Sequence, residues 1–543
     1  MGIQAAPSLE LLVKRVAPFW PSGLMVDRLQ GRISGLLSSG NVYISPALYS
    51  RFSLALLVYP LAGEVLAAAL LPTVQTLFVL GSLATVQLMP LLLLLARSGS
   101  RRRAVEAELP FFLIALSIMS QDSSPSIDGG MRRVAALGDG VFPALRSESD
   151  RLERDLTFIP GSPTSVLESA FRDNPSRSLR DFVHSFTTTL TTGKSVEGYV
   201  EEESKREVGQ MESRAKSFSE SVGSLAEVSL MVLALFPVGV EMIAAAIPGF
   251  ASSVMLIVSM GLLATFSVVL LVVLESVQPV AHNTPPASLY IVLSLASWVA
   301  STALYLLGTL PLAFSLLIPF GFSVFGFFRT RGVYDRIRRG EQEISLLLHD
   351  LAEASKAGVS LPEALAKITA SSSQFGSIGE PLSVFHHAIM SGATPAEAQK
   401  GVSHPSWLVR LSFGLLSVAF STGAGFEQLE RLSSFFKRVT DARRNASRSL
   451  LPFVLIGVIV PVISVASLNF LGGFSSGSTG SGIPFLPSLA DVSKTYVLIT
   501  ISAVALLTGV LLSKLFTQTA RHGVAIPLLM ASTLVSLAVF GVL

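Results

Sequence analysis

Three carboxylates lie inside apolar sequence, where an ionisable group could carry protons or cations. Glu64, Glu227 and Glu241 each fall within a hydrophobic stretch of roughly 20 residues. A charge near the centre of a bilayer costs about 2.5–3.5 kcal/mol on insertion scales, so these glutamates are candidates for a proton or cation path. The alternative is a neutral, hydrogen-bonded carboxyl at a helix contact. We favour the alternative, because the apolar stretches of the second half of the chain contain no acidic residue.

The motifs that would indicate an enzyme are incomplete. The triplet Gly193-Lys194-Ser195 lacks the glycine that a phosphate-binding loop needs five residues earlier, where Thr188 stands. The segment 473–477 matches a G-x-S-x-G nucleophile motif, but it lies in a Gly/Ser-rich run without strand or helix context. The chain has no cysteine, which excludes disulfides and zinc–cysteine sites. We therefore expect no enzymatic activity, no cofactor and no metal.

The elements that must position these residues are hydrophobic. Half of the 543 residues are apolar, 14% are charged and the mean hydropathy is +0.60, which is typical of a membrane protein. The net charge of +3 gives no indication of nucleic-acid binding. The sequence predicts an all-α, polytopic membrane protein in which nine stretches are long enough to cross a bilayer: 52–71, 74–96, 225–248, 253–274, 289–308, 310–328, 450–471, 495–516 and 524–543.

The distribution of basic residues predicts the orientation in the cell membrane. Lys and Arg accumulate on the cytoplasmic side. With a cytoplasmic N-terminus, 39 of the 40 basic residues lie inside, only Lys494 lies outside, and the C-terminus is extracytoplasmic. The predicted order is a cytoplasmic segment (1–51), two transmembrane helices (52–96), a cytoplasmic helical domain (97–224), two transmembrane helices (225–274), a cytoplasmic loop (275–288), two transmembrane helices (289–328), a second cytoplasmic helical domain (329–449), and three transmembrane helices (450–543) with a Gly/Ser-rich extracytoplasmic loop (472–493).

The two cytoplasmic domains are similar to each other. Short matches keep their order while their offset falls from 235 to 224 residues: Glu106-Ala107-Glu108 with Glu341-Gln342-Glu343, Asn174-Pro175-Ser176 with His404-Pro405-Ser406, Thr192-Gly193 and Glu197 with Thr422-Gly423 and Glu427, and Pro237 with Pro461. Both copies have the same orientation, which predicts a parallel duplication. Each proline removes a helix hydrogen bond, so the recurring pair is either a retained hinge or a packing kink.

The second domain is predicted to be a helical bundle. Apolar residues recur at helical spacing in two segments, one with Ile344, Leu347, Leu348 and Leu351, the other with Phe426, Leu429, Leu432 and Phe436. A break is expected at Gly358. Two S/T-x-x-E capping boxes are predicted at Ser360 with Glu363 and at Thr394 with Glu397. The first domain follows the same plan with weaker caps.

These features resemble the platform proteins of type II secretion and type IV pilus machines, the GspF, PilC and TadC group. The resemblance is carried by the segment 351–365, the segment 420–429, the proline-containing stretch after each domain, and the duplication itself. It covers roughly residues 100–250 and 335–475 and favours archaeal pilus and archaellum (FlaJ-like) members. It implies a homodimeric, non-enzymatic protein that couples a hexameric secretion ATPase to insertion of pilin or archaellin subunits into a filament.

Two basic clusters frame the second domain and are candidates for ATPase docking. One lies at the start of the domain and the other in the last part of its final helix: Arg336, Arg338 and Arg339, then Lys437, Arg438, Arg443 and Arg444. Contact with the anionic headgroups of the lipid bilayer is the alternative. A secondary transporter, or a membrane scaffold with duplicated transmembrane units, remains the alternative function for the whole chain.

Overall fold

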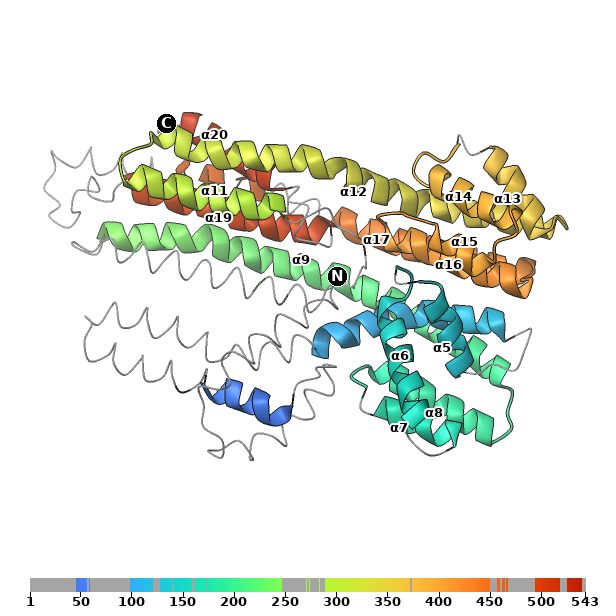
Figure 1. Ribbon diagram of the computed structural model, residues 1–543. Coiled ribbons are helices and arrows are strands. Elements are labelled where there is room, and N and C mark those ends of the chain that lie inside the picture. Colours follow the sequence, from blue (N-terminus) through green and yellow to red (C-terminus); the bar gives the residue numbers. More distant parts are fainter. Residues whose placement is uncertain are drawn as a thin grey trace, which may run out of the picture. The chain divides into compact units, whose positions relative to one another are not determined.

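The computed structural model is all-α in the residues that it describes, which confirms the all-α part of the predicted fold class (Figure 1). No strand occurs in the residues that the structure describes, which are 45–55, 58, 98–120, 127–138, 140–158, 162–172, 174–246, 270, 273, 283, 289–371, 374–449, 457–459, 461–463, 465–466, 494–517 and 525–539. Several predicted spans coincide with helices within this set. The stretches 74–96 and most of 52–71, 253–274 and 450–471 lie outside it.

In the described part of the chain, no helix combines the length and the apolar character that crossing a membrane requires.

The chain divides into two compact units, residues 1–207 and 208–543. In the first unit we call residues 98–207 the first helical domain. It contains a helix at 98–119, α5 (Ile127–Ala136), α6 (Pro143–Phe158), α7 (Pro163–Arg172), α8 (Arg177–Thr191) and the start of α9 (Val196–Ala246). Its core is aromatic, because Phe111, Phe112, Phe142, Phe182 and Phe186 are all at most 1% exposed. The predicted helical bundle is therefore present.

The second helical domain (residues 329–449) belongs to the second unit. It contains the C-terminal part of α12 (Leu312–Lys356), followed by α13 (Leu361–Ala370), α14 (Gly379–Met390), α15 (Pro395–Lys400), α16 (Trp407–Thr422) and α17 (Phe426–Ser449). The predicted apolar face of α12 is correct, since Ile344, Leu347, Leu348 and Leu351 are at most 1% exposed. This face packs against α17, where Leu429, Leu432 and Phe436 are buried.

Helix ends follow the predicted signals in two of three places. Gly358, where a break was expected, adopts the left-handed conformation after α12, with φ of +81°. Gly193 and Gly423, which the repeat matched to each other, do the same after α8 and α16, with φ of +68° and +65°. Thr394 forms the expected capping box with Glu397. The box predicted at Ser360 is wrong, because the Ser360 side chain makes no cap hydrogen bond. The Glu363 carboxylate instead pairs with Lys367 at 3.1 Å, one turn further on.

The rest of the second unit is built around α19 (Lys494–Thr517), which is buried on all sides over residues 501–506 and 508–514. It packs against α20 (Ile526–Val539). A hydrogen bond from the Trp298 indole to Ser502 Oγ (2.9 Å) joins it to α11 (Leu289–Leu306), and α11 packs along α12. A helix that is apolar all round has no side left for water, which fits this central position.

Gly509 sets the close approach of α19 to α20. A Cβ atom at this position would lie 2.9 Å from the backbone Cα of Ile526, which cannot rotate away. Gly509→Ala should therefore separate the two helices and destabilise the protein by about 1–3 kcal/mol. Gly321→Ala is the matched control, because a Cβ there meets nothing within 4 Å and alanine favours a helix. The thermal unfolding midpoint of the purified chain should fall for the first variant and stay or rise for the second.

Candidate functional site

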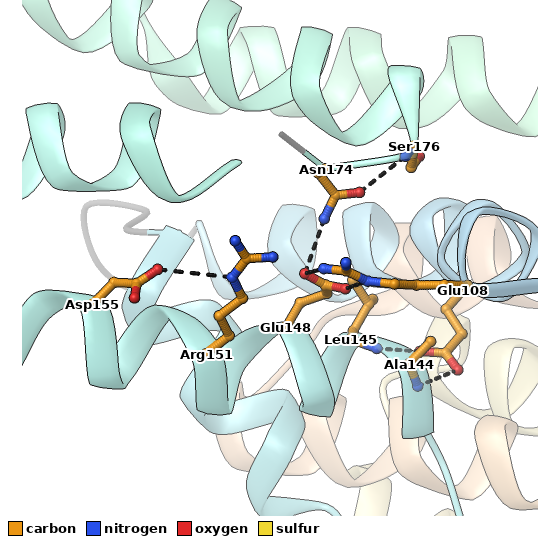
Figure 2. A network of polar contacts seen from close by, with 9 residues as sticks. Glu108, Ala144, Leu145, Glu148, Arg151, Asp155, Asn174 and Ser176 are labelled. Atoms are coloured by element: carbon orange, nitrogen blue, oxygen red, sulfur yellow. Dashed lines mark hydrogen bonds and ion pairs between the residues drawn. The ribbon is translucent and has the colours of Figure 1, made fainter. Parts of the chain in front are cut away.

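A buried ion pair joins the first helix of the first helical domain to α6. The Nε and Nη2 atoms of Arg101 each donate a hydrogen bond to the Glu148 carboxylate at 2.8 Å, and Glu148 is only 3% exposed. The Asn174 side-chain amide donates to the same carboxylate at 2.9 Å. Asn174 Oδ1 in turn accepts from the Ser176 backbone N–H, at the start of α8 (Figure 2). One polar network therefore holds together three segments: the first helix, α6 and the segment that leads into α8.

Glu108 performs a second structural task seven residues further along the same helix. Its carboxylate is fully buried and accepts from the backbone N–H groups of Ala144 (2.9 Å) and Leu145 (2.8 Å), in the first turn of α6 (Figure 2). The first N–H groups of a helix have no partner within the helix, and the positive end of the helix dipole favours an anion there. Glu108 therefore fixes the start of α6 against the first helix.

The second helical domain repeats this bond with Glu343. Its carboxylate accepts from the backbone N–H groups of Ser377 (2.8 Å) and Ile378 (2.9 Å), which lead into α14. Glu343 is the residue that the sequence matched to Glu108. Two residues paired from the sequence thus make the same kind of contact in the two domains.

These bonds extend the match between the domains through α6 and α14. Glu108 corresponds to Glu343 at an offset of 235, while Ala144 and Leu145 correspond to Ser377 and Ile378 at 233. Burial agrees with this register. The buried positions of α6 coincide with those around α14, which pairs Leu145 with Ile378, Glu148 with Pro381, Ser149 with Leu382 and Leu152 with Phe385.

His404 occupies the place of Asn174 and makes the corresponding bond. Its Nδ1 accepts from the Ser406 N–H at 3.1 Å, as Asn174 Oδ1 does from Ser176. Its Nε2 lies 3.1 Å from the Ser377 hydroxyl, which itself donates to the Arg336 carbonyl at 2.7 Å. Nδ1 must therefore be unprotonated, and Nε2 carries the hydrogen.

The larger imidazole is accommodated by a smaller residue on α12. A Cβ at Gly340 would lie 2.6 Å from His404 Cε1. In the first domain the residue equivalent to Gly340 is Val105 and the residue equivalent to His404 is the smaller Asn174, and both are buried. At these two equivalent positions the second domain combines a small residue with a large one, Gly340 with His404, whereas the first combines Val105 with Asn174.

Burial, together with the nearby charges of Arg336 and Arg410, lowers the pKa of His404 to about 4. The cause agrees with the hydrogen bonds, because a second proton on Nδ1 would face the Ser406 N–H. The buried imidazole is neutral when folded.

The predicted docking residues are mostly exposed. Arg336, Arg338 and Arg339 on α12 and Lys437 and Arg444 on α17 are all exposed; we call these five residues the basic band. Arg438 differs from the expectation, because its guanidinium pairs with Glu212 of α9 at 3.2 Å. A side chain already engaged within the chain is a weaker docking candidate. Arg443 lies within α17, and its side chain is outside the described set.

The remaining predicted residues are distributed over α9 and the later stretches. Glu227 and Glu241 both lie in α9, and Glu227 is exposed. α9 continues through Pro237, and Pro461 is buried in a short helical segment. Glu64 lies outside the described residues. The proton-path and hinge roles stay predictions.

The described residues contain no group of three or more His, Cys, Asp or Glu side chains that could hold a metal. Comparisons with protein-family models, with curated proteins and with solved structures found no match.

Acidification should destabilise the second helical domain through His404. The unfolded imidazole binds a proton near its usual pKa of 6.5, whereas the folded one does so only near 4. Stability is therefore full above pH 6.5 and falls as the pH drops toward 4, by about 2 kcal/mol or less at about pH 5. His404→Asn, which introduces the residue of the first domain, should show a smaller loss between pH 7.5 and pH 5 in thermal unfolding of the full chain. An equal loss in both proteins would contradict this role.

The pairing of Gly340 with His404 predicts non-additive substitutions. Gly340→Val alone should destabilise by about 1–3 kcal/mol, because its side chain enters the space of His404. In the His404→Asn background the same change reproduces the Val105–Asn174 pair and should cost much less. A double-mutant cycle of unfolding free energies measures the coupling. Additive costs would show that the two positions are independent.

Proposed function

We propose that the chain is a membrane platform protein of a type IV pilus-like machine, an archaeal pilus or archaellum, that couples a cytoplasmic secretion ATPase to pilin insertion. The observation that carries this proposal is the 45-residue helix α12, which begins in a predicted span and ends inside the second helical domain. At 1.5 Å per residue it is roughly 68 Å long. A continuous helix of this length would transmit a push or twist from the domain to the membrane.

Exposed apolar side chains support membrane insertion of the N-terminal part of α12 and of its neighbours. Large apolar residues that are 41–75% exposed gather on α11, α12 and α20 and on the turn after α11: Val292, Val299, Leu307, Phe314, Leu317, Phe322, Phe325, Phe328, Val535 and Val539. By contrast, α13 to α17 expose only Val384 and Met390 among their described large apolar residues. An extended apolar surface is typical of a contact with lipid or with another protein.

Contacts within the second unit agree with the predicted sidedness. Asn283, from the short loop predicted to be cytoplasmic, accepts from the Trp407 N–H at 2.7 Å, in the second helical domain. Trp298 and Ser502, which bond to each other, both come from predicted spans. Two segments predicted to be cytoplasmic are thus in contact with each other, and so are two predicted spans.

Two members of the basic band, Arg338 and Arg444, lie at one level along the paired helices α12 and α17. Lys356, at the end of α12, stacks its ammonium on Phe426 at the start of α17, 5.5 Å from the ring centroid. The helices pack against each other and therefore run antiparallel. Arg338 precedes Lys356 by as many residues as Arg444 follows Phe426, so the two arginines lie at the same height. Such a concentration of positive charge suits an acidic partner surface.

Breaking α12 between the domain and the predicted span tests the coupling. Gly332 is exposed and a Cβ there meets nothing within 4 Å. Gly332→Pro removes a helix hydrogen bond and kinks the helix, so we expect cells with this variant to lose surface filaments at unchanged protein level. Gly332→Ala keeps the helix and should retain filaments, counted by electron microscopy.

Deletion of the whole chain provides the reference for this test. If cells that lack the chain still build filaments, the platform function is wrong. If the deletion removes filaments but Gly332→Pro does not, the platform function stands but α12 does not transmit the motion.

A further inference from the structure

Arg101 and Arg336 occupy equivalent positions, but within the described part of the chain only Arg101 has a counter-ion. Each arginine lies seven residues before the glutamate that holds a helix start, Glu108 or Glu343. The Arg101 side chain is 11% exposed and forms the two-bond pair with Glu148. Arg336 is exposed, and the described residues offer its side chain no ion pair.

The second domain has no carboxylate at the position equivalent to Glu148. Pro381 stands in α14 where Glu148 stands in α6. Ser377 precedes α14, and its hydroxyl donates to the Arg336 backbone carbonyl, so the start of α14 that contains Pro381 lies beside Arg336. A carboxylate at position 381 would therefore face Arg336 as Glu148 faces Arg101. The second domain thus has the arginine, Arg336, but no acid at the position of Glu148.

We propose that Arg336 is the specificity-determining residue of the docking surface and that it binds an Asp or Glu side chain of the partner, which takes the place of Glu148. A guanidinium forms two parallel bonds with a carboxylate, the geometry that Arg101 shows within the first domain. This inference rests on the proposed function, because it assigns the contact chemistry of the proposed ATPase interface.

The distance of Arg336 from the predicted membrane surface favours a protein carboxylate over a lipid phosphate as its binding partner. Phe328 is the last exposed large apolar residue of α12 before the basic band, and Arg336 follows it by eight residues, or roughly 12 Å of helix. The headgroup layer on one side of a bilayer is only about 5–8 Å deep. Arg329 and Arg331 lie within that depth, whereas Arg336 lies beyond it.

A glutamate introduced at position 381 should pair with Arg336 and thereby block its binding to a carboxylate of the partner. Pro381→Glu places a carboxylate in the first turn of α14, where the helix dipole favours it, and should pair with Arg336. Pro381→Gln is the matched neutral control. Arg336→Gln removes the proposed docking group, and Lys400→Gln removes an exposed charge on α15.

Two probes separate this inference from the proposed function: a fluorescent polyglutamate peptide and the secretion ATPase of the same cell. With the full chain in zwitterionic nanodiscs, Arg336→Gln and Pro381→Glu should each weaken polyglutamate binding about 5- to 10-fold. Combining them should add little, and Pro381→Gln and Lys400→Gln should bind like the unmodified chain. Thermal midpoints of all variants report whether they are folded.

Equal polyglutamate binding by the unmodified chain and by folded Arg336→Gln would overturn the inference. So would a loss of co-purified phosphatidylglycerol in Arg336→Gln at unchanged peptide binding, which would assign Arg336 to lipid. If polyglutamate binding depends on Arg336 but the ATPase does not bind at all, the carboxylate site stands and the proposed function fails.

Discussion

A carboxylate that accepts the first backbone N–H groups of a helix is the interaction on which both helical domains depend. Glu108, which is fully buried, and Glu343, which is half-buried, each project from a long helix and accept two backbone N–H groups from the next part of the chain. A buried N–H group that is left without an acceptor costs about 1–3 kcal/mol. The bond fixes where α6 and α14 begin and hence which of their residues face the long helix.

Three residue differences distinguish the second domain from the first. Gly340 and His404 stand where Val105 and Asn174 stand in the first domain, so the larger imidazole lies against a glycine and the bond to the next helix start is kept. Pro381 stands where Glu148 does, and among the described residues Arg336 has no ion pair. The first domain thus contains an internal ion pair, whereas the equivalent arginine of the second domain is exposed. The proposed docking role of Arg336 rests on this difference.

Much of the helical structure follows from local sequence. The apolar faces of α12 and α17, the break at Gly358 and the Thr394 capping box were all predictable from spacing and turn chemistry. The box at Ser360 was not, because Glu363 has a competing partner in Lys367. The repeat marked Glu108, Glu343, Asn174 and His404 as equivalent, but their roles depend on residues 26 to 37 positions away.

Ion pairs between distant segments were also beyond local patterns. The sequence placed Arg438 in a docking cluster, whereas its pairing with Glu212 joins helices separated by more than 200 residues. The Arg101–Glu148 pair could have been suspected from the alignment of the two domains, but only once their register through α6 and α14 was known. Tertiary contacts of this kind decide which exposed charges are available to a partner.

Sidedness of α12 is the most direct test of the central claim that this helix connects a cytoplasmic domain to the membrane. The chain has no cysteine, so single cysteines can be placed at exposed Thr309, before α12, and at exposed Lys400, in the second helical domain. In intact cells an impermeant maleimide should label Thr309→Cys, and it should label Lys400→Cys only after permeabilisation. Equal labelling of both positions in intact cells would contradict the account.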